Sequence, residues 1–194
     1  MDTFRANITF GLEYNEERYK IAMKCCELAE LVNSLPGGDL TEIGESGVSL
    51  SGGQMQRINI ARAVYADADI YIIDSPLSAL DFEIGSRILK NVFLGVLSSK
   101  TRIMCTQNLR YLKHFDMIYL MNNGKIDAFG VLDFIKLNKT FISLFDQDGS
   151  FNDAEYQFVT SGVDDKKTIE SSIRKDSASE ERQSIYPVRP GRLA

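Results

Sequence analysis

The sequence predicts an α/β fold, because helical and strand patterns alternate around one distinctive segment. The letters LSGGQ at residues 50–54 precede a helical apolar pattern over residues 55–65. The apolar run 70–73 follows and ends in Asp74, which predicts a buried strand. A second apolar run, 101–106, predicts another buried strand further along the chain.

Residues 50–54 have the features of an anion-binding helix start. Ser51 is a favourable N-cap residue, and Gly52 and Gly53 leave the backbone behind it bare. Such a helix start presents free N–H groups and the positive end of the helix dipole to an anion. Asp74, at the end of a strand, can supply a metal ligand at the edge of a sheet. Together these features indicate a surface that handles ATP.

Three short motifs resemble those of one known family. LSGGQ resembles the signature of ATP-binding cassette (ABC) ATPases, the strand that ends in Asp74 resembles their Walker B strand, and SALD at residues 78–81 resembles their D-loop. The resemblance covers about residues 3–145. The segments 40–47 and 61–65 are similar to subfamily C, the multidrug-resistance-protein exporters, and most similar to the first nucleotide-binding domain of those proteins.

This resemblance implies a fold and a domain arrangement. We expect a partial P-loop NTPase (ABC ATPase) domain at residues 1–146. It would contain a helical subdomain at about 12–66 and a region of Walker B, D-loop and switch elements at about 67–146. Residues 147–194 are rich in charged residues and serine, which predicts a mostly disordered linker.

The sequence has no phosphate-binding Walker A loop of the form G-x-x-x-x-G-K-[ST]. In the family this loop precedes the stretch that resembles the start of this chain, so we expect the sequence to begin inside a nucleotide-binding domain. The strands before it would pack against residues 70–73, where each buried aliphatic side chain contributes roughly 1.5–3 kcal/mol. We therefore expect the chain alone to fold poorly and to bind ATP weakly.

The resemblance also assigns roles to single residues. Asp74 would hold Mg²⁺ through a water molecule, beside ATP. The residues expected to contact the nucleotide belong to the signature and the D-loop: Leu50, Ser51, Gly52, Gly53, Gln54 and Asp81. In ABC dimers each signature closes over ATP held by the opposite domain, so this signature would serve a composite site.

Two departures from the family occur at its catalytic positions. Ser75 follows Asp74, where hydrolysing members have a glutamate that orients the attacking water, and serine is a poor base near neutral pH. Gln107 stands where they have a switch histidine, and the only histidine, His114, lies seven residues further on. We expect this domain's own site, with catalytic positions Asp74, Ser75 and Gln107, to bind Mg-ATP but to hydrolyse it slowly or not at all.

The leading hypothesis is therefore the ATP-binding segment of a membrane exporter that couples ATP binding and hydrolysis to substrate efflux. The implied partners are a second nucleotide-binding domain, the membrane-spanning domains of the same transporter, and a small-molecule or organic-anion substrate bound elsewhere. The segment would lie at the cytoplasmic face of a membrane and act as an ATPase only within the whole protein. Two alternatives stay open, an ATP-gated regulatory module of a subfamily C channel and a truncated gene product without function.

Composition argues against other classes of protein. The 194 residues carry a formal net charge of −5, whereas nucleic-acid binding requires a basic face. This charge and the subfamily C resemblance disfavour a soluble ABC ATPase of translation or DNA repair. No apolar run is long enough to span a membrane as a helix. The three cysteines, Cys25, Cys26 and Cys105, lack the spacing of a disulfide framework and are expected to be free thiols.

The remaining elements follow from periodicity and turn residues. One helix is predicted over residues 18–35, ended by the Pro-Gly-Gly at 36–38. Residues 117–130 predict a hairpin around an Asn-Asn-Gly turn, and two short helices are predicted near 131–137 and 141–145. A further helix is predicted over 84–97, with the following side chains directed inward: Ile84, Ile88, Leu89, Val92 and Val96.

A thermal melt tests the expectation that the chain folds poorly alone. We expect a broad transition that ATP does not shift, because apolar side chains of the 70–73 strand lack the strands that would cover them. Circular dichroism at rising temperature, with and without Mg-ATP, measures this. A single sharp transition that moves upward with ATP would contradict the expectation.

Overall fold

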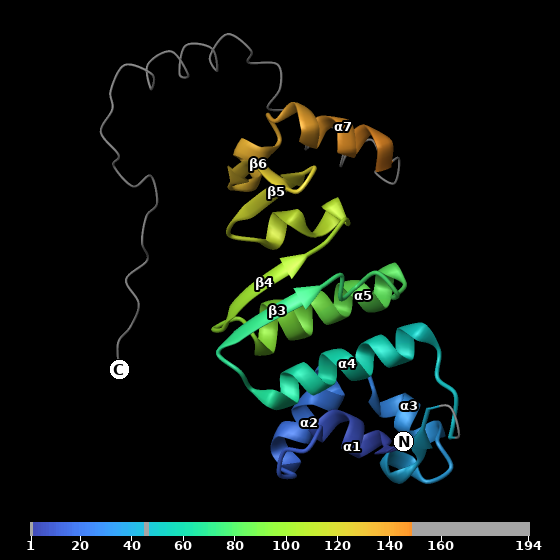
Figure 1. Cartoon of the computed structure of the whole chain (residues 1–194). Helices are drawn as coiled ribbons and strands as arrows, with labels where there is room; N and C mark the ends of the chain where they lie inside the picture. The colour runs from blue at the N-terminus through green and yellow to red at the C-terminus, as the bar shows by residue number, and fades with distance from the viewer. Residues whose placement is uncertain (1, 45–46, 149–194) are drawn as a thin grey trace, which may run out of the picture. The chain divides into compact units, whose positions relative to one another are not determined.

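Two compact units make up the chain, and each is described by itself (Figure 1). The structure is a computed structural model that describes residues 2–44 and 47–148. The first unit ends at His114, and the second begins at Phe115. The disordered linker predicted for residues 147–194 lies outside the described residues from residue 149 onward.

The first unit combines short helices with one pair of parallel strands. Its N-terminal part contains the antiparallel strands β1 and β2 and three helices: β1 (Asp2–Thr3), α1 (Phe4–Thr9), α2 (Glu16–Cys25), α3 (Ala29–Ser34), a 3-10 turn (Gly38–Leu40) and β2 (Glu42–Ile43). Its C-terminal part contains the parallel pair and its helices: α4 (Gly52–Ala66), β3 (Ile70–Asp74), α5 (Phe82–Ile88), a π-helical segment (Leu89–Val96), β4 (Thr101–Cys105) and a 3-10 helix (Leu109–His114).

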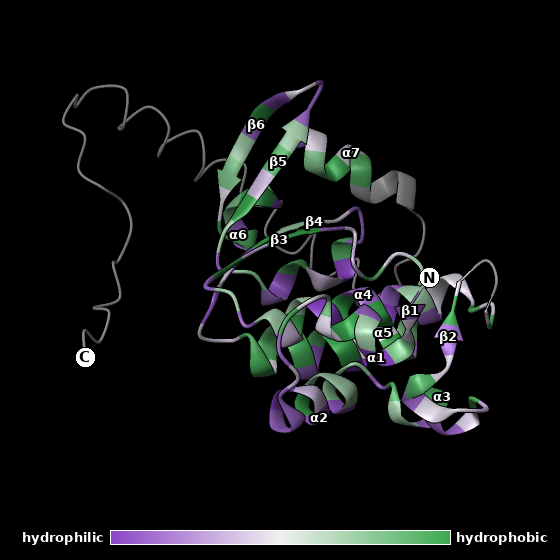
Figure 2. Cartoon of the chain, turned by 60° about the horizontal axis from the view of Figure 1, so that its bottom comes forward, coloured by the Kyte–Doolittle hydropathy of each residue, from purple (hydrophilic) through white to green (hydrophobic). Residues whose placement is uncertain are grey.

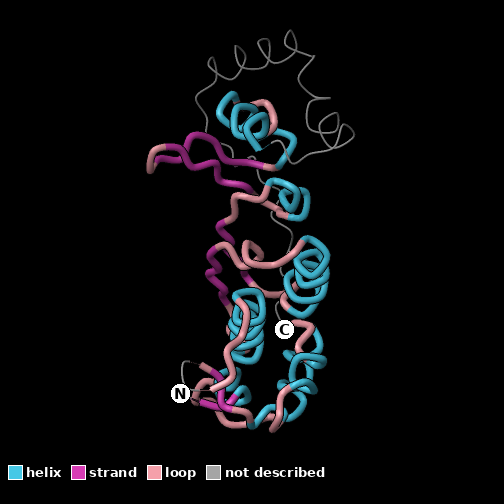
Figure 3. The backbone as a smooth tube through the Cα atoms, turned by 90° about the vertical axis from the view of Figure 1, so that its right-hand side faces the viewer, coloured by secondary structure: helices cyan, strands magenta, loops and turns pink. Residues whose placement is uncertain are grey.

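The two predicted strands are confirmed, but they are not buried on both faces. β3 and β4 pair in parallel, with Asp74 opposite Cys105. Side chains alternate between the two faces of a strand, and Tyr71 is buried while its neighbour Ile72 is 82% exposed. Ile103 of β4 is also exposed. Figure 3 shows helices on one side of this pair. The prediction of buried strands is therefore wrong for the second face, which no described residue covers.

The helix predicted over residues 18–35 is in fact two helices. α2 ends at Cys25, and Glu27 has a φ of +58°, a left-handed conformation that ends many helices. The next residue, Leu28, is fully buried, and α3 begins at Ala29. Glycine or asparagine normally marks such a turn, so the glutamate at this position gave no signal of the break.

The helix predicted over residues 84–97 is continuous, but its winding changes. α5 passes directly into the π-helical segment. Hydrogen bonds to the fifth residue widen each turn and shift the phase of the side chains. Val92 is buried as predicted, and Phe93 and Leu97 are buried as well. Val96, predicted to point inward, is instead exposed.

The N-terminal half of α4 binds two other segments through main-chain carbonyl groups. The Gln56 side-chain amide donates a hydrogen bond to the Pro76 carbonyl at 3.1 Å, in the turn after β3. The Arg57 guanidinium donates to the Glu27 carbonyl, between α2 and α3. Ile58, the next residue, is fully buried. This half of α4 thereby fixes the positions of the α2–α3 break and of the turn that follows Asp74.

The C-terminal half of α4 binds the segment around α1 in the same way. The Arg62 Nε donates to the Asn7 carbonyl at 2.7 Å. The Tyr65 hydroxyl donates to the Glu13 carbonyl at 2.5 Å and accepts from the Asn15 amide at 2.8 Å. Tyr65 is fully buried, and its two hydrogen bonds are partly buried. One helix therefore holds most of the first unit together.

The second unit contains the predicted hairpin and the predicted short helices: β5 (Ile118–Asn122), β6 (Lys125–Gly130), α6 (Leu132–Ile135) and α7 (Lys139–Asp148). Asn123 and Gly124 have φ values of +48° and +74°, as a two-residue type I′ turn requires, which confirms the hairpin. Tyr119 and Phe129 stack across the strands with ring centroids 5.8 Å apart. Figure 2 shows apolar positions along both strands. Within residues 2–44 and 47–148, no helix combines the length and the apolar character that a membrane crossing needs.

Candidate functional site

Residues 50–54 form a capped helix start. Ser51 is the N-cap of α4, and its hydroxyl accepts a hydrogen bond from the Gln54 amide at 3.2 Å. The Gln54 side-chain oxygen accepts in return from the Ser51 amide at 2.8 Å. This reciprocal capping box fixes the point where the helix begins. Leu50, just before it, is half-buried. The helix begins at Gly52, three residues before the apolar pattern that predicted it.

Two amide groups at this helix start are free to bind a ligand. The N–H groups of Gly52 and Gly53 make no hydrogen bond to any described residue. Ser51 and Gly52 are exposed, and the space where a Gly52 side chain would stand is open. The Ser51 hydroxyl accepts from Gln54, so its own proton remains available to another acceptor. Together with the dipole of a 15-residue helix, these donors favour a bound anion.

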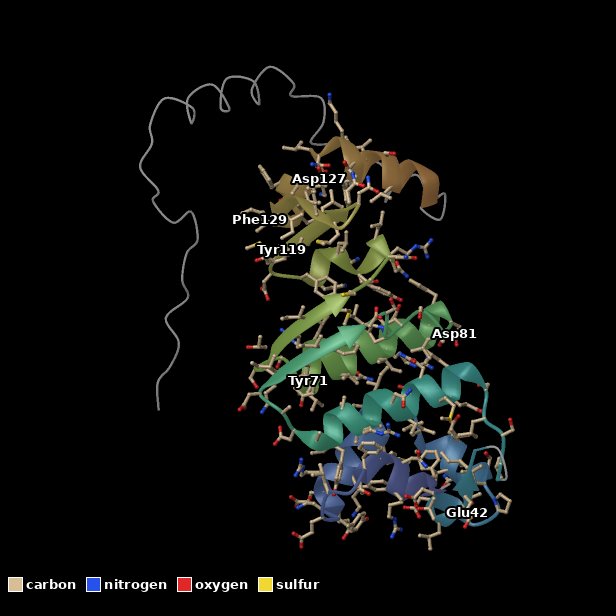
Figure 4. The ribbon with its side chains drawn as sticks, viewed as in Figure 1. Glu42, Tyr71, Asp81, Tyr119, Asp127 and Phe129 are labelled. Atoms are coloured by element: carbon tan, nitrogen blue, oxygen red, sulfur yellow. The ribbon has the colours of Figure 1, made fainter. Side chains whose placement is uncertain are left out.

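Gly53 joins this helix start to the segment 78–81. A side-chain carbon on Gly53 would stand 3.0 Å from the Ala79 carbonyl oxygen and 3.6 Å from the Leu80 side chain. A side chain at this position would therefore require the Ala79 carbonyl to move by a few tenths of an ångström. At the far end of the segment, Asp81 caps α5 by accepting from the Ile84 amide at 2.9 Å. Figure 4 shows Asp81 at the start of α5, and Figure 1 shows the starts of α4 and α5 on the same side of the unit as the ends of β3 and β4.

Asp74 and Ser75 occupy the exposed end of β3. Ser75 has a φ of +43°, which is uncommon for a residue other than glycine. Its amide donates to the Cys105 carbonyl at 3.0 Å, which holds this turn against the end of β4. Its hydroxyl donates to Asp74 Oδ1 at 3.1 Å. The Ser75 proton is thus engaged by a carboxylate, and the hydroxyl oxygen has no basicity near neutral pH.

Gln107 lies two residues beyond the end of β4 and is exposed. Because β3 and β4 are parallel and Asp74 lies opposite Cys105, Gln107 and Asp74 follow the same edge of the strand pair. No hydrogen bond joins either side chain to residues 50–54 in the described part of the chain. His114 ends the 3-10 helix further on and is exposed. Gly53 therefore approaches the segment 78–81, whereas Asp74 and Gln107 follow the same edge of the strand pair.

Asp74 is suited to a magnesium ion that is shared with phosphate. No group of three or more His, Cys, Asp or Glu side chains converges among the described residues, so a closed protein cage for a metal ion does not form there. Mg²⁺ usually keeps several waters and binds one or two carboxylates together with substrate phosphates. A single exposed carboxylate at a strand end fits that type of binding.

An exposed apolar surface follows α1 and was not foreseen from the sequence. Phe10 has a φ of +46° at the end of α1 and is 68% exposed, and Leu12 and Tyr14 are exposed as well. The Arg62 guanidinium carbon lies 4.2 Å from the centre of the Phe10 ring, which favours this ring position through a cation–π contact. The adjacent Gly11, with a φ of +82°, was the available sign of a turn that exposes this surface.

Comparison with known protein families gives a match to one region of the chain. The profile of the family described as "ABC transporter" matches residues 4–78. This region runs from α1 through the helix start at Ser51 and the strand end at Asp74. It therefore includes the free amides at the start of α4 and the exposed Asp74 at the end of β3.

Several curated proteins are similar to this chain. "ABC transporter C family member 8" of Dictyostelium discoideum is 50% identical over 127 residues, which is 64% of this chain and 8% of that protein. "ATP-binding cassette sub-family C member 2" of Rattus norvegicus is 48% identical over 126 residues, again 64% of this chain and 8% of that protein. "ABC transporter C family member 3" of Dictyostelium discoideum is 41% identical over 171 residues, 88% of this chain and 12% of that protein. The chain thus spans about a tenth of the length of these relatives.

A pair of glycine substitutions tests the contact between the helix start and the segment 78–81. Gly52→Ala should be neutral or stabilising by roughly 0.4–1 kcal/mol, because its side chain enters open space and the change restricts the unfolded chain. Gly53→Ala should be less stable than Gly52→Ala by about 1 kcal/mol or more, because the new carbon crowds the Ala79 carbonyl. Urea titrations followed by circular dichroism measure both. Equal stability of the two variants would refute the close approach.

Proposed function

Because the chain belongs to the ABC transporter family, with relatives in subfamily C, we propose that it is the ATP-binding segment of a membrane exporter. In this proposal the LSGGQ segment completes an ATP site whose other half lies on a second nucleotide-binding domain. The proposal rests above all on the helix start at Ser51, where two free amides, an available hydroxyl and a helix dipole face outward. We call the donors of residues 51–53 the phosphate clamp. The γ-phosphate of bound ATP is the group that the clamp would contact.

Residues 51–53 suit a phosphate that a partner presents. Ser51 and Gly52 are exposed, Gly53 is half-buried, and no described residue uses these donors, so an anion that a partner presents can reach them. The capping box holds the helix start in place before any ligand binds, which lowers the entropic cost of binding. Amide and hydroxyl donors around a transferring phosphoryl group stabilise the charge that develops on it. Leu50 and Gln54 support the clamp from its two ends, and Asp81 does so indirectly by fixing the start of α5.

The site at the end of β3 would bind Mg-ATP and turn it over poorly. Asp74 is the expected Mg²⁺ ligand, through a water molecule. Ser75, which takes the place of the catalytic glutamate, donates its proton to Asp74 and offers no base to an attacking water. Gln107, in place of the switch histidine, can donate a hydrogen bond without carrying charge. The proposed transporter is therefore asymmetric. This domain carries an intact signature, but its own catalytic positions support little hydrolysis.

The proposed partners are a second nucleotide-binding domain and the membrane-spanning domains of the same transporter. The surface formed by Phe10, Leu12 and Tyr14 supports a contact with the membrane-spanning domains, because a run of exposed apolar side chains marks interaction sites on proteins. The transported compound, a small molecule or an organic anion, would bind in those domains. This arrangement places the segment at the cytoplasmic face of a membrane.

A regulatory role is the second candidate, favoured by the changed residues at the catalytic edge. If neither Ser75 nor Gln107 supports hydrolysis, ATP binding alone could gate a channel of subfamily C. Flux measurements separate the two functions, because a channel conducts without ATP turnover and an exporter does not. A third reading, a truncated gene product without function, predicts that no variant of residues 50–54 alters transport or ATPase activity.

Ser51→Arg tests the phosphate clamp. In the transporter that carries this segment, ATPase activity at the composite site should fall at least tenfold, because the long cationic side chain fills the space in front of Gly52 and Gly53. Ser99→Arg is the matched control, since Ser99 is also exposed but lies far along the chain in the turn before β4. Steady-state phosphate release measures both variants. Unchanged turnover in Ser51→Arg would count against the composite site.

Ser75→Glu tests whether one residue limits hydrolysis at the domain's own site. A missing general base typically lowers the rate by 10²–10⁴-fold. We expect Ser75→Glu alone to restore little of the lost hydrolysis rate, because position 107 still has a glutamine in place of the histidine. The double variant Ser75→Glu with Gln107→His should restore more of the rate. Single-turnover ATP hydrolysis measures the two variants side by side. Full activity from Ser75→Glu alone would show that the glutamine is not limiting.

A further inference from the structure

Two neighbouring cysteines lie in contact at the end of α2. The sulfur atoms of Cys25 and Cys26 are 3.8 Å apart, and one thiol donates a hydrogen bond to the other. The Cys25 sulfur also lies 3.6 Å from the Ala22 carbonyl oxygen. Cys26 is fully buried, and Cys25 is 6% exposed. Nothing in the proposed ATP chemistry uses this pair of thiols.

A direct disulfide between the two cysteines does not suit this geometry. Consecutive Cα atoms in a trans peptide are about 3.8 Å apart, whereas disulfides usually join Cα atoms about 4.4–6.8 Å apart. The two sulfurs would also have to approach from 3.8 Å to about 2.05 Å. Both movements require the end of α2 to unwind. The helical conformation therefore keeps the thiols close to one another but unbonded.

A single bridging atom fits the same two sulfurs well. Two sulfur bonds of about 2.3 Å, the length seen to zinc, that span 3.8 Å meet at an angle of about 110°. A zinc ion would need further protein ligands, and no group of three His, Cys, Asp or Glu side chains converges among the described residues. The bridging atom must therefore already carry the substituent that completes its valence. Trivalent arsenic that carries one organic group has this valence, because it forms two bonds to sulfur and keeps one to carbon.

We propose that the Cys25–Cys26 pair is a bidentate binding site for trivalent organoarsenic compounds. Binding exchanges bonds without oxidation or reduction. In an arsenic oxide of the form R–As=O, the two arsenic–oxygen bonds are replaced by two arsenic–sulfur bonds, and the two thiol protons leave with the oxygen as one water molecule. The hydrogen bond from Cys26 lowers the pKa of the Cys25 thiol, which favours Cys25 as the first sulfur to attack.

The two thiols are buried, but residues on either side of them line a pocket. Lys24 and Glu27, which flank the pair in sequence, line an open pocket of about 860 Å³ formed mainly by α2 and α3. Glu27 also lies in the left-handed turn that separates α2 from α3. Neither cysteine lines this pocket, so binding requires the last turn of α2 to open locally, which the end of the helix at this point favours.

Phenylarsine oxide tests the site on the full 194-residue chain. The protein is incubated with the reagent in native buffer, digested without added thiols, and mapped by peptide mass spectrometry. We expect one arsenic per chain, on the peptide that contains Cys25 and Cys26, and none on the peptide of the exposed Cys105. Dithiothreitol should release the arsenic, whereas mercaptoethanol at equal thiol concentration should not. Arsenic on Cys105, or on no peptide, would overturn the proposal.

Two variants and a spectroscopic readout complete the test. Cys25→Ala should lower the retained arsenic at least tenfold, and Cys105→Ala should leave it unchanged. The helical circular dichroism signal of the wild-type chain should persist while arsenic binds. Loss of that signal on binding, or binding only in denaturant, would mean that the thiols react after α2 unfolds, and it would refute a site in the folded protein. The peptide map of the wild-type chain decides the location even if Cys25→Ala fails to fold.

Discussion

Hydrogen bonds from α4 side chains to main-chain carbonyl groups hold the first unit together. Gln56, Arg57, Arg62 and Tyr65 each donate to a carbonyl of a different segment. These carbonyls lie in loops and at helix ends, where no regular ladder can satisfy them. These hydrogen bonds are partly buried, and each contributes about 0.5–1.5 kcal/mol, so each bond constrains the backbone that it reaches. The two arginines therefore bind main-chain carbonyl groups of this unit, and the proposed phosphate contacts are left to the amides at the helix start.

The same helix determines how the candidate site is arranged. Its first turn is fixed from three directions, by the capping box of Ser51 and Gln54, by the approach of Gly53 to the segment 78–81, and by the bond from Gln56 to the turn after β3. Residues 51–53 and the turn that follows Asp74 consequently share one support, although no hydrogen bond joins them directly among the described residues.

Local patterns in the sequence predicted the parts of the structure that local chemistry determines. Ser51 before two glycines predicted the helix start, and Asp74 marked the end of the predicted strand. Asn123-Gly124 predicted the hairpin turn that the structure has. The break at Glu27 could not be predicted, because a left-handed glutamate is selected by the burial of its neighbour and by the carbonyl bond from α4. The phase shift of the π-helical segment and the exposure of Phe10 likewise depend on contacts with distant residues. The roles of the site residues toward ATP and magnesium remain predictions that the geometry supports.

The uncovered strand pair has a consequence for how this polypeptide is made. Among the described residues β3 and β4 pair only with each other, so each presents an outer edge of unsatisfied amides and carbonyls beside exposed isoleucines. Such edges recruit other strands without discrimination. During synthesis on the ribosome, the segment would have to meet complementary strands soon after it emerges, before chaperones or proteases engage it. The rate of translation, in addition to the contacts of the final structure, would then determine how much of the protein escapes aggregation and proteolysis.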